Sequence, residues 1–207
     1  MKLTRRRLVG LDRSGPEPVE TRPGAPLRPL TVPNLIGYAR LAGIPVFCYL
    51  AFESGDGRTA ASTALFAAIA GSDYLDGLLA RATGQYSRMG AILDPLVDRI
   101  TVLAGAAVCW HFELLPRWAL AVLAVREVVT LALAQTGLRR GLKLEINWVG
   151  RIGVILVMGG IFVALAADTA ISEILLIAGI AAAIAATMLY VRAGLARSPA
   201  PGATPTR

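Results

Sequence analysis

The sequence has very few of the residues that bind soft metals or form disulfide frameworks, with two cysteines and one histidine in 207 residues. Cys48 and Cys109 lie in separate apolar stretches and form no CxxC pair, so we expect neither a disulfide nor a zinc site. His111 falls in a connection on the opposite side of the predicted membrane from the acidic residues discussed below. We therefore expect it to take no part in catalysis.

Charged residues are also scarce, at 17% of the chain compared with about 25% in soluble domains, whereas 55% of the residues are hydrophobic. The hydrophobic residues come in blocks close to the roughly 20 residues that a helix needs to cross a bilayer. Helices are the expected spanning structure, because lipid offers no partner to backbone polar groups. We expect six of them, at about residues 34–52, 59–81, 89–110, 116–138, 147–167 and 171–192. The predicted fold is an all-α membrane protein, a six-transmembrane-helix bundle with a cytoplasmic-facing polar cleft.

The basic residues predict how the chain is oriented. The net charge is +7, and most Lys and Arg residues fall in the termini or in alternate connections. With the N-terminus in the cytoplasm, the outer connections carry only Arg58 and Arg117, in agreement with the positive-inside rule. We therefore expect a multi-pass protein of the cell membrane with both termini cytoplasmic.

The two ends of the chain differ in composition from the apolar middle. Residues 1–30 are basic and rich in proline, and we expect a disordered arm before a membrane domain at residues 31–193. Residues 194–207 are expected to be a disordered tail. The basic start has no apolar segment directly behind it, so no cleaved signal peptide is expected. No basic face with interleaved aromatic residues is visible, so nucleic-acid binding is not expected either.

The most informative stretch is GSDYLDGLLARATGQYSRMGAILDPLVDR, residues 71–99, where four aspartates lie at the ends of two neighbouring predicted helices. Asp73 and Asp76 are three residues apart and share a helical face. Asp94 and Asp98 are four apart and share a face of the next helix. The connection is short, so the helices are antiparallel neighbours. Both acidic faces can then meet near the cytoplasmic surface.

Four carboxylates in one cleft would repel one another strongly at low dielectric, and Arg81 alone supplies too little positive charge to offset them. Clusters of carboxylate oxygens select hard cations, so the sequence predicts two Mg²⁺ or Mn²⁺ ions. Two such ions can clamp a phosphoryl group during transfer. Glycines on the same faces leave room for a ligand, and Arg81 can pair with a phosphate.

Three other interpretations of the acidic stretch compete with a metal site. Charges at a membrane interface can reach into water, but this explains one aspartate better than four on two matched faces. Carboxylates inside membrane segments also mark cation transporters, yet these cluster near one membrane face with no acidic path across. A non-catalytic scaffold would not need four acidic positions.

The stretch resembles the signature of the CDP-alcohol phosphatidyltransferase family, which is D-x-x-D-G-x-x-A-R, eight residues, then G-x-x-x-D-x-x-x-D. The residues that match are Asp73, Asp76, Gly77, Ala80, Arg81, Gly90, Asp94 and Asp98. The resemblance implies a metal-dependent enzyme that transfers a phosphatidyl group from CDP-diacylglycerol to an alcohol and releases CMP.

The resemblance also implies a role for each matching residue. Two metal ions would be held by Asp73, Asp76, Asp94 and Asp98. Asp98 would also be the base that deprotonates the acceptor hydroxyl. The CDP site would be lined by Asp73, Gly77, Ala80, Arg81 and Gly90.

The acceptor is less defined by the sequence. The segments TVPNLIGYARLAGIPVF and ILDPLVDR are similar to bacterial members that accept glycerol 3-phosphate and to their cardiolipin-synthase relatives. Val97 and Arg99 stand where many glycerophosphate enzymes have Ala and Lys, which favours the cardiolipin type slightly. Arginines in later helices favour sn-glycerol 3-phosphate as the first choice, because a phosphomonoester is doubly charged. Phosphatidylglycerol and an inositol phosphate stay open as acceptors.

The candidate acceptor-binding residues are Arg126, Arg151 and Arg192. Arg151 and Arg192 are equally well explained as charges that set the topology, and Arg126 can form a buried pair with its neighbour Glu127. The last predicted helix contains AGIAAAIAA, which permits close helix packing. That packing serves either the monomer or a homodimer, and we expect a homodimer.

Overall fold

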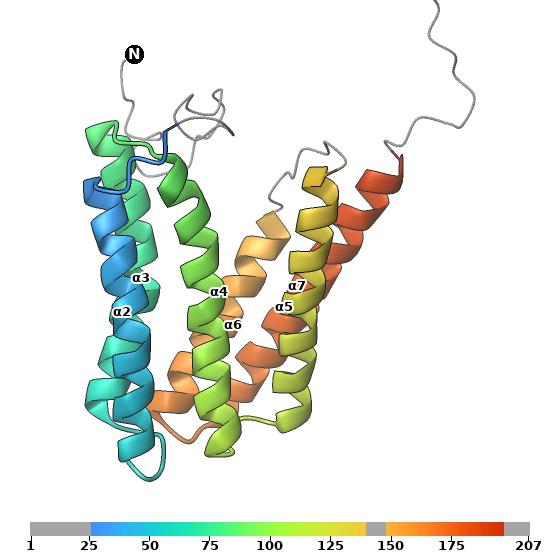
Figure 1. Cartoon of the computed structure of the whole chain (residues 1–207). Coiled ribbons are helices and arrows are strands. Elements are labelled where there is room, and N and C mark those ends of the chain that lie inside the picture. Colours follow the sequence, from blue (N-terminus) through green and yellow to red (C-terminus); the bar gives the residue numbers. More distant parts are fainter. Residues whose placement is uncertain (1–25, 140–147, 197–207) are drawn as a thin grey trace, which may run out of the picture. The chain divides into compact units, whose positions relative to one another are not determined.

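The computed structural model describes residues 26–139 and 148–196, and within these it leaves the side chains of residues 74, 76, 77, 81, 133–139 and 190–196 undescribed. The described part of the chain is all-helical and contains no strand. Its helices are α2 (Val32–Glu53), α3 (Ala60–Thr83), α4 (Arg88–His111), α5 (Arg117–Arg139), α6 (Trp148–Ala166) and α7 (Ala170–Ala196) (Figure 1). The six helices lie where the apolar blocks predicted them. The predicted terminal arms fall almost wholly outside the described residues.

Local capping chemistry explains where the first three helices begin. Thr31 caps α2 by accepting a hydrogen bond from the backbone N–H of Asn34, and Pro33 follows in the first turn. Thr59 and Ser62 form a reciprocal capping box at the start of α3. Ser87 caps α4 by accepting from the N–H of Gly90 at 3.0 Å. Each start therefore follows from side chains within three residues of it.

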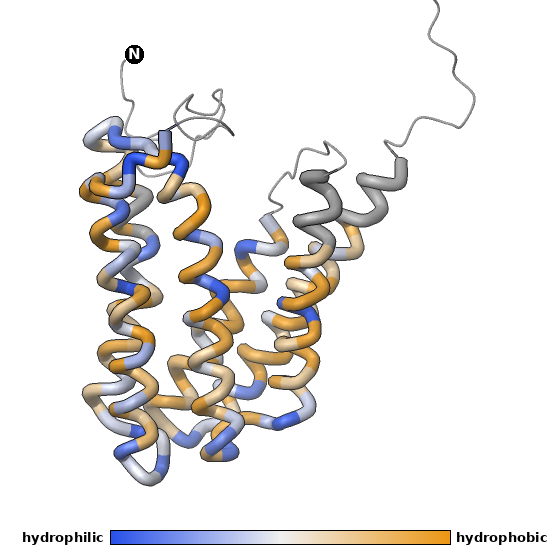
Figure 2. Tube along the Cα trace, viewed as in Figure 1, coloured by the Kyte–Doolittle hydropathy of each residue, from blue (hydrophilic) through white to orange (hydrophobic). Residues whose placement is uncertain are grey.

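Three of the helices are long and apolar enough to cross a membrane, namely Val32–Glu53, Trp148–Ala166 and residues Ala170–Leu189 of α7. The 22 residues of α2 span about 33 Å, compared with about 30 Å for the hydrocarbon core. Figure 2 shows apolar turns along the helices and hydrophilic residues mainly near their connections. The chain is therefore a membrane protein.

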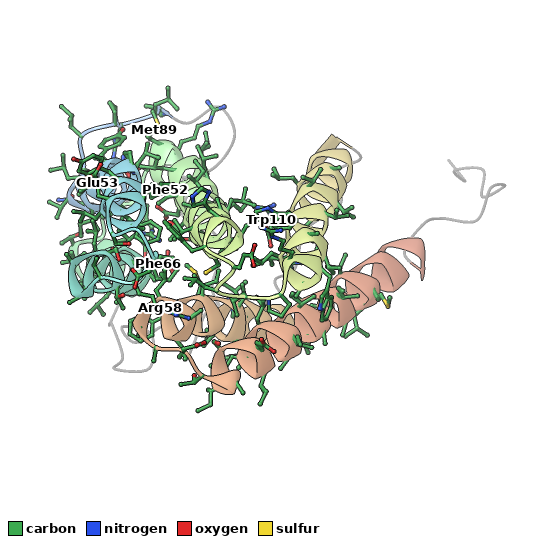
Figure 3. All side chains as sticks on the ribbon, turned by 90° about the horizontal axis from the view of Figure 1, so that it is seen from below. Phe52, Glu53, Arg58, Phe66, Met89 and Trp110 are labelled. Atoms are coloured by element: carbon green, nitrogen blue, oxygen red, sulfur yellow. The ribbon has the colours of Figure 1, made fainter. Side chains whose placement is uncertain are left out.

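The described residues up to Leu114, with Leu165–Ala167, form one compact unit built on α2, α3 and α4. Its core contains the rings of Phe47 and Phe66, whose centroids are 5.3 Å apart (Figure 3 labels Phe66). The two cysteines are free, with Cys109 buried and Cys48 half-buried.

Hydrogen bonds join the starts of α2 and α4 at one end of this unit. The backbone N–H of Val32 donates to Oε1 of Gln85 at 3.1 Å, and Oγ of Ser87 donates to Oδ1 of Asn34 at 3.0 Å. The amide nitrogen of Asn34 also donates to the carbonyls of Arg28 and Pro29, at 3.0 and 3.1 Å. Asn34 is 1% exposed, so these bonds satisfy a buried amide.

The second compact unit comprises Leu115–Ala164 and the described residues from Asp168 onward, and contains α5, most of α6, and α7. Glycines let α6 and α7 approach until their backbones touch. A Cβ at Gly153 would lie 2.9 Å from the backbone nitrogen of Ala183, and one at Gly160 would lie 2.8 Å from that of Leu176. A Cβ at Gly179 would lie 2.6 Å from the nitrogen of Val157. Gly179 of the small-residue stretch is thus used for packing within the chain.

Candidate functional site

The four predicted site aspartates lie on α3 and α4, which run in opposite directions on either side of a short connection. Asp73 and Asp76 are on α3, before its end at Thr83, and Asp94 and Asp98 follow the start of α4 at Arg88. The left-handed backbone of Gly84, with φ of 66°, ends α3 and begins the turn between them. Antiparallel helices with this turn bring the two pairs toward the same level.

A buried arginine from α2 joins Asp73 to Asp98. Nη1 of Arg40 lies 3.3 Å from Oδ1 of Asp73, and Nη2 lies 2.6 Å from Oδ1 of Asp98. Nε of the same guanidinium donates to the backbone carbonyl of Ile69 at 3.1 Å. Two of the four predicted site aspartates therefore meet at one arginine side chain, which was not among the site residues predicted from the sequence.

Two glycines on α2 explain how Arg40 comes to lie between the other helices. A Cβ at Gly37 would meet the side chain of Leu93 on α4, and a Cβ at Gly43 would meet Ile69 on α3. Arg40 lies midway between these glycines in the sequence. Because α2 approaches α4 on one side of Arg40 and α3 on the other, the guanidinium enters the space between the two acidic helices.

The exposure of the three side chains differs in a way that matters for function. The side chain of Arg40 is 2% exposed, whereas those of Asp73 and Asp98 are 48% and 39% exposed. A buried guanidinium needs charged or strongly polar partners, and the two carboxylates and a carbonyl supply them. The carboxylates, by contrast, are open to a ligand on their outer side.

The donor chemistry of these residues fits a hard divalent cation, because carboxylate oxygens from two helices converge. Asp73 and Asp98 each accept a hydrogen bond from the Arg40 guanidinium through Oδ1. Asp94 is half-buried on α4, and the side chain of Asp76 lies outside the described residues. Among the described side chains, no group of three or more His, Cys, Asp or Glu residues is gathered closely enough to hold a metal ion.

The structure describes the side-chain surroundings of three of the five residues predicted to line a CDP site, namely Asp73, Ala80 and Gly90. Ala80 is half-buried on α3, and the side-chain surroundings of Gly77 and Arg81 lie outside the described residues. Gly90 packs against Asn34, since a Cβ there would lie 2.8 Å from Oδ1 of Asn34 and 3.2 Å from Oγ of Ser87. Packing within the protein is thus one reason for a glycine at this position.

The candidate acceptor-binding arginines belong to the second unit. Nη1 of Arg126 forms an ion pair with Oε1 of Glu127, and the Glu127 side chain is 8% exposed. The guanidinium carbon of Arg151 lies 5.3 Å from the centre of the Trp148 ring, a cation–π distance. The side chain of Arg192 lies outside the described residues. The buried pair anticipated for Arg126 is therefore present.

Comparison with known proteins identifies the family of this chain. A family model described as CDP-alcohol phosphatidyltransferase matches residues 30–189. The chain is 38% identical over 128 residues to the cardiolipin synthase (CMP-forming) of Streptomyces coelicolor, which covers 60% of each chain. It is 34% identical over 125 residues to a putative cardiolipin synthase of Mycobacterium tuberculosis, covering 60% of this chain and 59% of the relative.

A third relative carries a different name. The CDP-diacylglycerol--glycerol-3-phosphate 3-phosphatidyltransferase of Pseudomonas fluorescens is 35% identical over 108 residues, covering 51% of this chain and 55% of the relative. The matched stretches thus span less than two thirds of these relatives, whereas the family model covers most of this chain, including all four aspartates and Arg40. The chain is a member of the CDP-alcohol phosphatidyltransferase family, as its aspartate motif predicted.

Proposed function

We propose that this protein transfers a phosphatidyl group from CDP-diacylglycerol to an alcohol and releases CMP. The observation that carries the proposal is the meeting of Asp73 and Asp98 across Arg40, with both carboxylates partly exposed. These two residues are the first and last aspartates of the family motif. Their proximity supports a single site built from both halves of that motif.

Members of this family generally use a divalent metal, and we propose two Mg²⁺ or Mn²⁺ ions here, held by Asp73, Asp76, Asp94 and Asp98. When bound, the ions neutralise negative charge on the pyrophosphate of the CDP-lipid. The protein's own contribution is to present carboxylate oxygens from two adjacent helices. Gly77, Ala80, Arg81 and Gly90 are proposed to line the nucleotide site beside them.

Asp98 is proposed as the general base. Its carboxylate accepts the proton of the acceptor hydroxyl, and the resulting oxygen attacks the phosphorus that bears the diacylglycerol. A new phosphorus–oxygen bond forms, the bond from that phosphorus to the bridging pyrophosphate oxygen breaks, and CMP leaves with the electron pair. The 39% exposure of the Asp98 side chain is compatible with contact to an acceptor.

Phosphatidylglycerol is the acceptor that we favour, which would make cardiolipin. Two of the three relatives described above carry cardiolipin synthase names, including the one that is 38% identical. Arg126 was one of three arginines that favoured glycerol 3-phosphate from the sequence, yet its charge is offset by the buried Glu127 carboxylate. A neutralised pair attracts a doubly charged phosphomonoester less than a free arginine would.

Glycerol 3-phosphate is the second candidate, which would make phosphatidylglycerophosphate. The name of the Pseudomonas fluorescens relative supports it, at 35% identity. If Arg151 binds the phosphate of this acceptor, it would do so while its guanidinium lies against the Trp148 ring. An arginine so placed can still present guanidinium N–H groups to a phosphate.

The deciding experiment offers purified protein, CDP-diacylglycerol and Mg²⁺ with one acceptor at a time. Phosphatidylglycerol, glycerol 3-phosphate and inositol phosphate are tested separately, and CMP and the lipid product are identified by mass. We expect cardiolipin and CMP with phosphatidylglycerol. Phosphatidylglycerophosphate as the sole product would replace the favoured acceptor by the second one. No CMP with any acceptor, from protein that folds and binds metal, would contradict the proposed activity.

We also propose that all six helices cross the membrane, with both termini and the aspartates on the cytoplasmic side. Three helices meet the criterion of length and apolar composition. The others, α3, α4 and α5, carry ionisable residues such as Asp73, Asp98 and Arg126, which lower their apolar character without shortening them. A homodimer remains a prediction from the small residues of α7.

A further inference from the structure

We propose that Arg40 is a positioning residue for the aspartate site, whose single guanidinium fixes where the Asp73 and Asp98 carboxylates lie. The inference rests on the proposed function, because it assigns these carboxylates to a metal and substrate site. It adds a residue from α2, a helix that contributes nothing to the aspartate motif.

The contacts of Arg40 require several hydrogen-bond donors in one rigid, branched group. Three different nitrogens of Arg40 reach three acceptors: the carbonyl of Ile69 and the carboxylates of Asp73 and Asp98. Ile69 and Asp73 are one helical turn apart on α3, so Arg40 holds α3 at two successive points and α4 at a third. The guanidinium is planar and rigid, so fixing one of its nitrogens also restricts the directions of the other two. Lysine has one ammonium on a flexible stem and cannot reproduce this arrangement.

The anchor on α3 is itself well defined. The carbonyl oxygen of Ile69 also accepts a hydrogen bond from Oγ of Ser72 at 2.9 Å. The carbonyl belongs to a helical backbone and therefore does not move as a side chain would. The hydrogen bond from Nε therefore fixes the position of the guanidinium relative to the backbone of α3. The two terminal nitrogens, Nη1 and Nη2, in turn fix the positions of the two carboxylates.

The burial of the Arg40 side chain indicates that it positions the carboxylates and does not contact the substrate itself. The Arg40 side chain is 2% exposed and lies behind carboxylates that are 48% and 39% exposed. A ligand that approaches the exposed sides of the carboxylates meets Asp73 and Asp98, while Arg40 stays covered. Arg40 therefore acts through the two aspartates, and its positive charge lets two carboxylates from different helices lie close together.

A purely structural clamp is the competing explanation, and Mn²⁺ affinity distinguishes the two. Arg40→Lys keeps the charge and loses the rigid, branched group of donors, so its effect on the site reports geometry alone. Arg40→Met also removes the charge, which by itself would strengthen cation binding. A positioning role predicts weaker Mn²⁺ binding in both variants, since the carboxylates are no longer held.

The experiment measures Mn²⁺ binding to purified protein by electron paramagnetic resonance, together with CMP release and thermal unfolding. In Arg40→Lys we expect Mn²⁺ affinity and kcat each to fall by about 10- to 100-fold, the usual effect of removing a group that orients metal ligands. With Mn²⁺ at saturating concentration, the KM for CDP-diacylglycerol should change less than kcat, because the buried Arg40 side chain acts on a ligand only through the two carboxylates. The control is Thr63→Val, which removes the bond from Oγ1 of Thr63 to the carbonyl of Leu165 at 3.0 Å. It should lower thermal stability and leave Mn²⁺ affinity unchanged.

Several outcomes would overturn the inference. Arg40→Lys with wild-type Mn²⁺ affinity and kcat would do so, as would tighter Mn²⁺ binding in Arg40→Met. Failure of both variants to fold would assign Arg40 to the fold instead. Wild-type protein that binds Mn²⁺ but releases no CMP would contradict the proposed function alone, and the Arg40→Lys affinity would still decide this inference. Wild-type protein that does neither would overturn both.

Discussion

Asn34 and Ser87 are 53 residues apart in sequence, yet Oγ of Ser87 donates to Oδ1 of Asn34 at 3.0 Å and ties the start of α2 to the start of α4. Gly90 lies directly against this bond, with no room for a Cβ. The glycine was expected to give a nucleotide access to the helix. Its packing gives a second, independent reason for the absence of a side chain there.

Gly90→Ala should therefore destabilise the folded protein even without substrate. The added Cβ would lie 2.8 Å from Oδ1 of Asn34, and overpacking of this kind costs about 1–3 kcal/mol. We expect a lower thermal unfolding midpoint in detergent. The cost should shrink when Asn34→Ala is made in the same protein, because the clashing oxygen is gone. Equal cost in both backgrounds would show that the clash with Asn34 is not the cause.

Metal removal should abolish activity. Carboxylate oxygens from Asp73, Asp76, Asp94 and Asp98 suit Mg²⁺ or Mn²⁺, and the proposed chemistry depends on a cation at the pyrophosphate. CMP release should stop in excess chelator and return when either ion is added back. Full activity in chelator would contradict the metal-dependent mechanism.

Asp98→Asn should separate catalysis from binding. The amide keeps an oxygen that can accept from Arg40 but cannot act as a base at neutral pH. Turnover should fall by about 10²-fold or more, the range for losing general base catalysis, while binding of CDP-diacylglycerol survives. Asp56→Asn is a matched control, because Asp56 is an exposed carboxylate in the connection between α2 and α3. A near-normal turnover in Asp98→Asn would rule out the proposed base.

Membrane orientation can be tested by cysteine labelling in intact cells. In a background with Cys48→Ala and Cys109→Ala, single cysteines are placed at Glu53 and Ala82, which are exposed near the ends of α2 and α3. The proposed topology puts residue 53 outside and residue 82 in the cytoplasm. An impermeant thiol reagent should therefore label only Glu53→Cys. Labelling of Ala82→Cys alone would reverse the topology.

The helices could be predicted from sequence because their signals are local. Apolar blocks of bilayer length mark each helix, and Thr31, Thr59 and Ser87 cap three of them through residues at most three positions away. The acidic halves of the site were equally local, since Asp73 with Asp76 and Asp94 with Asp98 share faces by spacing alone. The motif then identified the family, which the match over residues 30–189 confirms.

Arg40 could not be predicted in the same way, because its partners are distant along the chain. Asp73 is 33 residues away and Asp98 is 58 residues away. A signal was present, however: a single arginine inside an apolar helix, three residues from Gly37 on one side and from Gly43 on the other. Charges in such segments rarely lack a partner. Spacing alone does not say which partner, and three-dimensional packing was needed to supply it.

The backbone contacts between α6 and α7 also constrain how this part of the molecule can move. Interfaces made of interlocking side chains can be reset by rotamer changes, but Gly153, Gly160 and Gly179 offer no side chain to rearrange. Sliding one helix along the other would drive a neighbouring Cβ into a main-chain atom. We therefore expect α6 and α7 to move together, as one rigid pair, in any conformational change of this unit.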